Sequence, residues 1–424
     1  MKRFIVSLCI LCCLTGALYA GGRSNSGSGT GGTVTIEYWQ YFFESKVNLM
    51  DDLIAQFERQ NPGIKVEQNH FPYETYQQKV ASSVPVGTGP EIVNLFYGWL
   101  PTWVKAGYIM PLPQSEFSTA YFKDNFFNFV EESVKFNNRY YSVPTAVRTL
   151  ALVWNKKLFR EAGLDPEKPP TTLDELLDYA KRLTKYDAQG NIIQSGLSML
   201  TQGQGHSYIR EILIRQFGGV PYSADGRQVT YNTPQGEAAL KWYTDRITVD
   251  RIGSPTFVSE DVAGFRGNIL AMVVDGSFRI ATYRGIADLE WGAAEVPSHN
   301  GIKSNYTSFW TNSIVEGVTG AKLDASIKFL KFLASPEVQA QWLDRIGELP
   351  ANPQFAAQQA NVPYVGEFLK GLEYAHATIF VDETGQRDVF VNMVDEVILN
   401  NVSPAAAIRN AAQLEQRIID DFWR

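Results

Sequence analysis

The chain has 424 residues, of which 45% are hydrophobic and 20% are charged, and this composition is ordinary for a globular protein. A chain of this length is sufficient for two domains with separate hydrophobic cores. Its formal net charge of −7 makes nucleic acid and anionic membrane surfaces poor candidates as partners.

The N-terminal residues have the pattern of a secretory signal peptide, which we place at 1–20. Two basic residues precede an apolar segment at 4–14, and small residues follow at 17–22. The apolar segment is too short to span a bilayer. Cleavage after Ala20 is favoured over cleavage after Gly22. The mature protein is therefore expected in the periplasm, and a lipid anchor is not expected.

All three cysteines, Cys9, Cys12 and Cys13, lie in the segment that cleavage would remove. The mature chain is therefore expected to have no disulfide, no thiol nucleophile and no thiolate metal site. Residues 21–32 are rich in glycine and serine and contain no apolar side chain to bury. This composition predicts a flexible linker.

Strands and helices alternate in the part of the sequence that follows the linker. A strand at 34–39, an amphipathic helix at 47–59 and a strand that begins at 64–66 form a βαβ unit, which predicts parallel pairing. A second helix at 75–84 and a strand at 91–96 continue the alternation. The pattern predicts an α/β fold.

A later segment has an unusual order of elements. Two β-prone runs, at 140–143 and 149–154, are separated by Pro144, which disfavours helix for the residue before it. Asn155 is placed to cap a helix that follows at once. A second helix is expected to begin at Thr172, because a glutamate three residues later completes the spacing of a capping box.

Short motifs accompany these elements. The sequence contains Tyr-Ser-Val-Pro at 141–144, Val-Trp-Asn-Lys-Lys-Leu-Phe at 153–159, Ala-Gly-Leu at 162–164 and Pro-Thr-Thr-Leu-Asp-Glu-Leu at 170–176. In these motifs the chain resembles the extracellular solute-binding proteins of bacterial ATP-binding cassette (ABC) importers, specifically the sugar-binding group that is similar to maltose-binding protein. Trp154 stands where this family more often has Tyr, and Leu173 where it more often has Trp.

The resemblance covers essentially the whole chain after the linker. Further motifs that carry it are Asn-Pro-Gly-Ile-Lys-Val at 61–66, Gly-Pro-Glu-Ile-Val at 89–93, Phe-Arg-Gly-Asn-Ile-Leu-Ala-Met at 265–272 and Gly-Glu-Leu-Pro-Ala-Asn at 347–352. It implies a two-lobed periplasmic binding protein fold, in which each lobe is a parallel-rich sheet flanked by helices and chain crossings form a hinge.

The resemblance also implies that each lobe is discontinuous in sequence. We expect the chain to cross between the lobes near Ala146, near Ser277 and near Ile314. The first lobe would then comprise 33–146 plus 279–314, and the second lobe 147–278 plus 315–424.

The sequence offers little support for an enzyme. Its four histidines are far apart and in no metal-ligand spacing, and it has neither a nucleophile elbow nor a phosphate-binding loop. We therefore expect no catalytic residue, no cofactor and no bound metal. A secreted glycoside hydrolase remains the enzymatic alternative, because two carboxylates that face each other across a cleft leave no motif in the sequence. A structural role as an adhesin or scaffold is a third hypothesis.

The resemblance implies capture of a carbohydrate between the lobes and its delivery to ABC permease subunits in the inner membrane by a monomeric protein. The high aromatic content of 13% agrees with this, since aromatic rings suit the apolar face of a pyranose. Large aromatic cores explain the same number equally well. A binding protein for a non-sugar polyol or glycerol phosphate is an alternative within the same class.

Candidate ligand contacts are carried over from the family by position, and they fall after strands or beside crossings. The predicted site residues are Trp39, Gln40, Tyr41, Glu44, Tyr97, Trp99, Arg148, His206, Tyr208, Ser277, Phe278, Trp310 and Phe390.

Arg148 has two interpretations. Its planar guanidinium has five donors and no acceptor, so that it suits a carboxylate or phosphate held by two hydrogen bonds. The alternative is a salt bridge at the hinge to an acidic residue of the opposite lobe.

Overall fold

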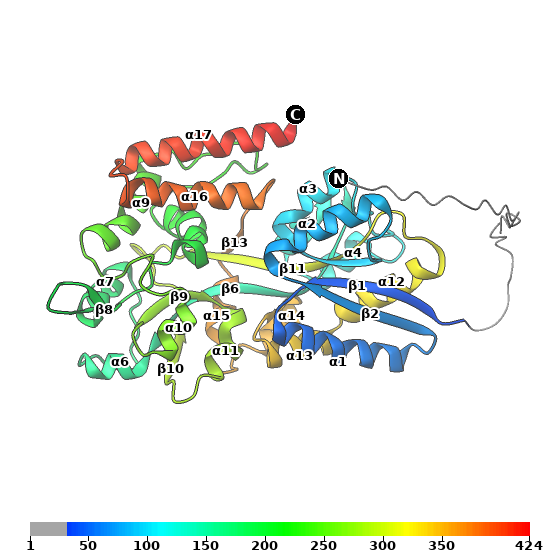
Figure 1. Cartoon of the computed structure of the whole chain (residues 1–424), viewed down its shortest axis with the longest axis horizontal. Coiled ribbons are helices and arrows are strands. Elements are labelled where there is room, and N and C mark those ends of the chain that lie inside the picture. Colours follow the sequence, from blue (N-terminus) through cyan, green and yellow to red (C-terminus); the bar gives the residue numbers. More distant parts are fainter. Residues whose placement is uncertain (1–31) are drawn as a thin grey trace, which may run out of the picture.

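The computed structural model describes residues 32–424, and the predicted signal peptide at 1–20 and nearly all of the predicted linker at 21–32 lie outside this range. Figure 1 shows two α/β lobes side by side, with two long strands that run from one lobe into the other. These strands are β6 (Val143–Asn155) and β11 (Asn305–Ile314). Between residues 32 and 424, no helix combines the length and hydropathy needed to cross a bilayer.

The first lobe is built around β1 (Val34–Tyr41). This strand pairs in parallel with β2 (Ile64–Phe71) on one side and β3 (Ile92–Phe96) on the other. Helix α1 (Glu44–Gln60) connects β1 to β2 and buries one apolar stripe against the sheet. The predicted βαβ unit is confirmed. The remaining helices before β6 are α2 (Tyr73–Ser83), α3 (Leu100–Lys105), α4 (Thr119–Asn125) and α5 (Asn128–Ser133).

Pro144 does not divide two strands as predicted, because β6 continues through it. The register of β6 against β11 shifts at this point: Trp310 faces Ala146, whereas Thr311 faces Pro144. The shift marks a β-bulge, where a proline without an N–H group does not interrupt the ladder. The predicted run at 140–143 divides between β5 (Arg139–Tyr140), which pairs with β4 (Lys135–Phe136), and the start of β6.

The second lobe uses the far half of β6. There β9 (Met272–Gly276) and β10 (Trp291–Ala294) pair with β6 on its two edges, and both pairs are antiparallel. Parallel pairing in this lobe is found between the start of β11 and the short strand β13 (Ala375–Ala377), and in isolated bridges such as Ser195 with Leu270. The expectation of a parallel-rich sheet therefore holds for β1, β2 and β3, whereas in the second lobe the longer strands β9 and β10 pair antiparallel with β6 and the three-residue β13 pairs in parallel with β11.

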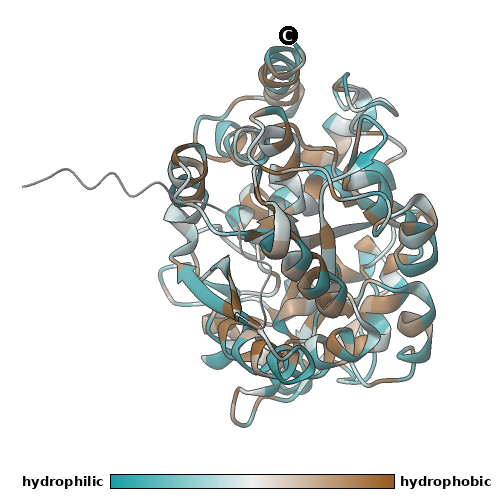
Figure 2. Cartoon of the chain, turned by 90° about the vertical axis from the view of Figure 1, so that its right-hand side faces the viewer, coloured by the Kyte–Doolittle hydropathy of each residue, from teal (hydrophilic) through white to brown (hydrophobic). Residues whose placement is uncertain are grey.

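Helices of the second lobe cover this sheet, with α16 and α17 packed on each other and on α9. Figure 2 faces the first lobe, whose helices carry both hydrophobic and hydrophilic residues, as amphipathic helices do. Asn155 caps α6 and Thr172 caps α7, as predicted. The main helices are α6 (Lys156–Glu161), α7 (Leu173–Leu183), α9 (Pro234–Thr248), α10 (Asp261–Arg266), α11 (Ile280–Arg284), α15 (Val365–Leu372), α16 (Glu383–Ile398) and α17 (Pro404–Trp423).

The predicted lobe boundaries are wrong for two segments. Helices α12 (Gly320–Leu333) and α13 (Pro336–Arg345) were expected in the second lobe, but they pack on β1 and α1 of the first. Conversely, α11 and β10, expected in the first lobe, extend the second: Tyr283 of α11 contacts Trp291 of β10, which pairs with β6. Hydrophobic periodicity identifies the buried face of a helix but not the sheet that covers it.

One predicted crossing moves as a consequence. The chain crosses in β6 near Ala146 and in β11, which ends at the predicted Ile314. The third crossing is not near Ser277, where β9 ends. It is at β12 (Leu349–Pro350), which pairs with β6 at Val147 and Ala146 between the first-lobe helix α13 and the second-lobe helix α15.

Candidate functional site

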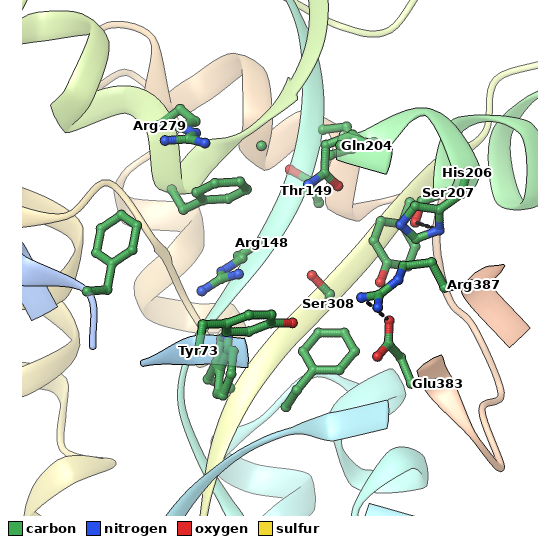
Figure 3. Close-up of a pocket in the computed structure, with 18 of the residues that line it drawn as sticks. Tyr73, Arg148, Thr149, Gln204, His206, Ser207, Arg279, Ser308, Glu383 and Arg387 are labelled. Atoms are coloured by element: carbon green, nitrogen blue, oxygen red, sulfur yellow. Dashed lines mark hydrogen bonds and ion pairs between the residues drawn. The ribbon is translucent and has the colours of Figure 1, made fainter. Parts of the chain in front are cut away.

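A cavity of about 380 Å³ lies between the lobes, where β6 and β11 cross (Figure 3). Its volume is within the range of small-molecule binding sites. The crossing strands contribute its floor, with Arg148 and Thr149 from β6 and Tyr306, Ser308 and Trp310 from β11. Each lobe supplies one wall.

The first-lobe wall is aromatic. It comprises Tyr41, Phe43, Tyr73 and Phe96 together with Trp310 from the floor. The ring of Tyr41 stacks on Trp310 with 4.0 Å between the centroids, and Tyr73 lies edge-on to Tyr41 at 5.7 Å. Because these rings pack on one another, the wall has its shape without a ligand.

The second-lobe wall begins with an irregular turn, Thr201–Gly205, which has π-helical hydrogen bonding and a non-helical residue at Gly203. Such turns are frequent at functional sites. A Cβ atom on Gly205 would lie 2.8 Å from the carbonyl oxygen of Leu200 and from the hydroxyl of Tyr243, so that glycine is required there. The turn presents polar side chains to the cavity, among them Gln204 and His206.

His206 is neutral in this wall. Burial lowers the pKa of its imidazole well below the usual value, and the charges of Arg210 and Arg387 lower it further. Its Nδ1 lies 3.3 Å from the hydroxyl of Ser207, which also lines the cavity. A neutral imidazole has one donor and one acceptor, both suited to hydroxyl groups.

The segment after β9 completes the wall with Phe278 and Arg279. A Cβ atom on Gly276 would lie 2.2 Å from the ring of Phe278, so glycine allows this ring to fold back on its own strand. Two guanidinium groups contact the same ring. The Cζ atom of Arg148 is 4.8 Å from its centroid, and that of Arg279 is 5.3 Å from it.

A buried ion cluster lies beside the floor. Glu348 Oε1 accepts hydrogen bonds from Lys46 Nζ and Arg148 Nε, each at 2.5 Å. Burial lowers the pKa of Lys46 to about 7, and the nearby charge of Arg148 acts in the same direction. Burial alone would raise the pKa of Glu348, but the charges of Arg148 and Lys46 lower it, so that Glu348 remains ionised. The structure therefore contains a salt bridge of Arg148, which was the second of its two interpretations.

Five predicted site residues line this cavity, namely Tyr41, Arg148, His206, Phe278 and Trp310. Two others lie next to it and connect the lobes. Trp99 donates from Nε1 to Glu383 on α16 at 3.3 Å, and Tyr97 donates to the carbonyl oxygen of Thr378 at 3.2 Å.

The other predicted residues do not line the cavity. Strand β1 extends to Tyr41, so that Trp39 and Gln40 lie within it rather than in a loop and bond to Glu37 and Gln68. Glu44 is exposed at the start of α1. The buried side chains of Tyr208, Ser277 and Phe390 belong to the second lobe, and Phe390 packs under the guanidinium of Arg210 at 4.0 Å.

Sequence reasoning missed several lining residues. Arg279 directly follows the predicted pair Ser277 and Phe278, so its position was the nearest available signal. Lys46 and Tyr73 occupy the first turns of α1 and α2, and Glu383 and Arg387 lie on α16. These residues are far from the motifs, and no local pattern distinguishes them. Among residues 32–424, no group of His, Cys, Asp and Glu side chains is arranged to hold a metal.

Comparison with known proteins gives the family. Residues 52–364, more than half of the chain, match the model of the bacterial extracellular solute-binding protein family. The chain belongs to this family. It is therefore a solute-binding protein of the type that serves ABC transporters and not an enzyme. It is 26% identical over 346 residues to the sn-glycerol-3-phosphate-binding periplasmic protein UgpB of Salmonella typhimurium, an alignment that covers 74% of each protein.

Solved structures of solute-binding proteins share the fold. An ABC substrate-binding protein of Listeria monocytogenes in complex with cycloalternan has a TM-score of 0.79 at 18% identity, covering 91% of this chain and 99% of that one. The maltose/maltodextrin-binding domain of Bdellovibrio bacteriovorus bound to maltotriose has a TM-score of 0.75 at 23% identity, covering 91% and 100%. The predicted α/β periplasmic binding protein fold is confirmed.

Proposed function

We propose that this solute-binding protein captures a carbohydrate in the cavity between its lobes. The observation that carries the proposal is the pairing of the two walls: a packed aromatic wall faces a wall of amide, imidazole and hydroxyl groups. A pyranose has an apolar face of C–H groups and a rim of hydroxyls, so it matches both walls at once.

The names of similar proteins support this ligand class. Relatives and structural neighbours include proteins described as bound to cycloalternan and to maltotriose, and a maltotriose-binding protein of Pyrococcus abyssi that is 21% identical over 360 residues. The relatives described as binding sn-glycerol 3-phosphate favour a second candidate, a polyol phosphate.

Delivery and location complete the proposal. The protein would release its ligand to the permease subunits of an ABC importer, as its family implies, and it would act in the periplasm after export by the predicted signal peptide. The predicted residues Tyr41, Arg148, His206, Phe278 and Trp310 are proposed as ligand contacts, together with Tyr73 and Gln204.

Thermal unfolding in the presence of a ligand panel tests the proposal. The panel contains mono-, di- and oligosaccharides, polyols and glycerol phosphates. A ligand present at a hundredfold excess over its dissociation constant stabilises a folded protein by about 2.7 kcal/mol, which is a clear rise in Tm. No shift with any member of the panel would contradict carbohydrate binding, and turnover of a bound oligosaccharide would restore the hydrolase hypothesis.

A further inference from the structure

The cavity is lined by more positive than negative charge. Lys46, Arg148, Arg279 and Arg387 line it, whereas the carboxylates at or beside it are those of Glu383 and Glu348. Arg387 pairs with Glu383 at 3.3 Å. Lys46 and Arg148 share the single carboxylate of Glu348, so that together they carry one excess positive charge whenever Lys46 is protonated.

Arg279 carries the other excess charge. Its guanidinium has no hydrogen bond or ion pair with another residue in the range 32–424 that the structure describes. The nearest acids are engaged elsewhere: Asp275 accepts from Tyr283 and from the amide of Gly276, and Asp261 accepts from Ser198 at 2.5 Å. Burial raises the pKa of both acids, which weakens the countercharge that they offer to Arg279.

Arg279 and the shared cluster of Arg148 border the same ring. Arg148 and Arg279 both contact the ring of Phe278, and both guanidinium groups lie on the left side of the cavity in Figure 3, with Glu383 and Arg387 on the right. A neutral sugar that filled the cavity would offer Arg279 hydroxyl oxygens as acceptors but no countercharge, and a charge that loses water without gaining a countercharge is costly. An anionic group at this place would instead accept charge-assisted hydrogen bonds.

We infer that the ligand is an anionic carbohydrate, a sugar or polyol whose carboxylate or phosphate group binds between Arg148 and Arg279 beside Phe278. This inference rests on the proposed function and specifies its ligand class. The aromatic first-lobe wall then holds the sugar ring or carbon chain, and the second-lobe wall holds the charge.

Calorimetric titration of the mature protein with matched ligand pairs tests the inference. Glucuronate is compared with glucose, galacturonate with galactose, and glycerol 3-phosphate and glucose 6-phosphate with glycerol and glucose. In at least one pair the anionic member should bind about 10-fold or more tightly than its neutral counterpart, since hydrogen bonds between charged groups contribute at least this much. Which arm responds distinguishes a carboxylate from a phosphate.

Variants of Arg279 test where the anionic group of the ligand binds. Arg279→Gln should weaken binding of the preferred anion about 10-fold or more and change binding of its neutral counterpart less than twofold, and Arg279→Lys should give an intermediate loss because it keeps the charge without the planar fork. Arg266→Gln is the matched control, because it removes the same charge from an exposed position on α10. Each variant is first shown to have an unchanged unfolding midpoint, and Arg279→Lys replaces Arg279→Gln if the latter does not fold.

Failure of this inference can be distinguished from failure of the proposed function. Neutral sugars that bind as tightly as their anionic counterparts, or an Arg279→Gln variant with unchanged affinity for the anion, would overturn the inference and leave the proposed function intact. Inorganic phosphate or sulfate that binds as tightly as the sugar derivative would overturn it as well, because the site would then be an anion site only. A panel in which no carbohydrate binds overturns the proposed function and the inference with it.

Discussion

The two walls of the cavity are built on different physical principles. The first-lobe wall consists of rings that contact each other, from Tyr73 through Tyr41 to Trp310 and on to Trp99, whose centroid lies 5.3 Å from that of Trp310. The second-lobe wall consists of a glycine-containing turn and polar or charged side chains such as Gln204 and Arg279. The first wall offers a shape that exists before binding, and the second offers hydrogen bonds and charges that a ligand must satisfy. We expect the first to contribute affinity and the second to contribute selectivity.

The largest effect is expected at Glu348, because this residue joins Lys46 of the first lobe to Arg148 of the floor. Glu348→Gln leaves Lys46 and Arg148 buried without a countercharge, and loss of one partner of a buried ion pair costs about 3–5 kcal/mol. Urea unfolding should show this decrease in the free energy of unfolding. Glu367→Gln is the control, since its pair with Lys370 is exposed and is expected to contribute less than about 1 kcal/mol. Equal stabilities of the two variants would show that the cluster does not stabilise the junction of the first lobe with the floor.

Asp261 tests the support of the second-lobe wall. This carboxyl borders a small pocket that Gln204 and Gly205 also line. Burial raises its pKa to about 7, with a contribution from the charge of Asp275. The folded state therefore binds this proton more tightly than the unfolded state, and stability falls as the pH rises from about 4 to about 7.

Between pH 5 and pH 8 the loss of stability from this shift is at most about 3 kcal/mol. The Asp261→Asn variant cannot ionise at this position and should lack this part of the pH dependence of stability. It should be more stable than the wild type at pH 8, and this difference should be smaller at pH 5. Unfolding midpoints at both pH values measure the difference. Parallel pH profiles for the two proteins would contradict a raised pKa at Asp261.

Trp310 tests the first-lobe wall. Trp310→Ala removes the ring on which Tyr41 stacks, and the affinity for the ligand should decrease by about 1–3 kcal/mol if this ring is a central contact. Trp310→Phe keeps an aromatic face and should recover part of the loss. Affinity is measured by calorimetry at a temperature where both variants are folded. Trp423→Ala, at the exposed end of α17, is the control, and an affinity for Trp310→Ala equal to that of the control would move the site away from this wall.

The smallest expected effect is at Gln204, whose side chain points into the cavity from the second-lobe turn (Figure 3). Gln204→Ala removes hydrogen bonds to ligand hydroxyls and should lower affinity by about 0.5–1.5 kcal/mol with little change in stability. For two sugars that differ at one hydroxyl, the ratio of affinities should change more in Gln204→Ala than in Trp310→Phe. An equal change in both variants would remove the distinction between affinity and selectivity that the two walls suggest.

Much of the fold could be predicted because its signals are local. The 2.0 and 3.6 residue periods, the caps at Asn155 and Thr172, and the motifs around Pro144 identify strands, helices and the family. The lobe that contains α12 and α13 could not be predicted, since an amphipathic helix packs equally well on either sheet. The bulge at Pro144 also escaped prediction, because it depends on a partner strand far away in the sequence.

The site was less predictable than the fold for the same reason. Arg148 and Phe278 were found because they follow family motifs, whereas Glu383 and Arg387 reach the cavity from a helix near the C-terminus. The partner of Arg148 illustrates the difficulty. Glu348 lies in the motif at 347–352, yet only the folded chain brings its carboxylate to Arg148 and Lys46.

The pairing of β3 with β11 has a consequence for the order of folding. Asn94 on β3 bonds to Asn312 on β11, a residue 218 positions later in the chain, and α12 and α13, which pack on the same lobe, follow β11 in the sequence. An N-terminal fragment therefore cannot close the first sheet, however stable its βαβ unit is. Closing so long a loop is entropically expensive and slow. The chain has to be nearly complete before either lobe becomes a folding unit, so that a protein truncated before β11 should remain unfolded and accessible to proteases and chaperones.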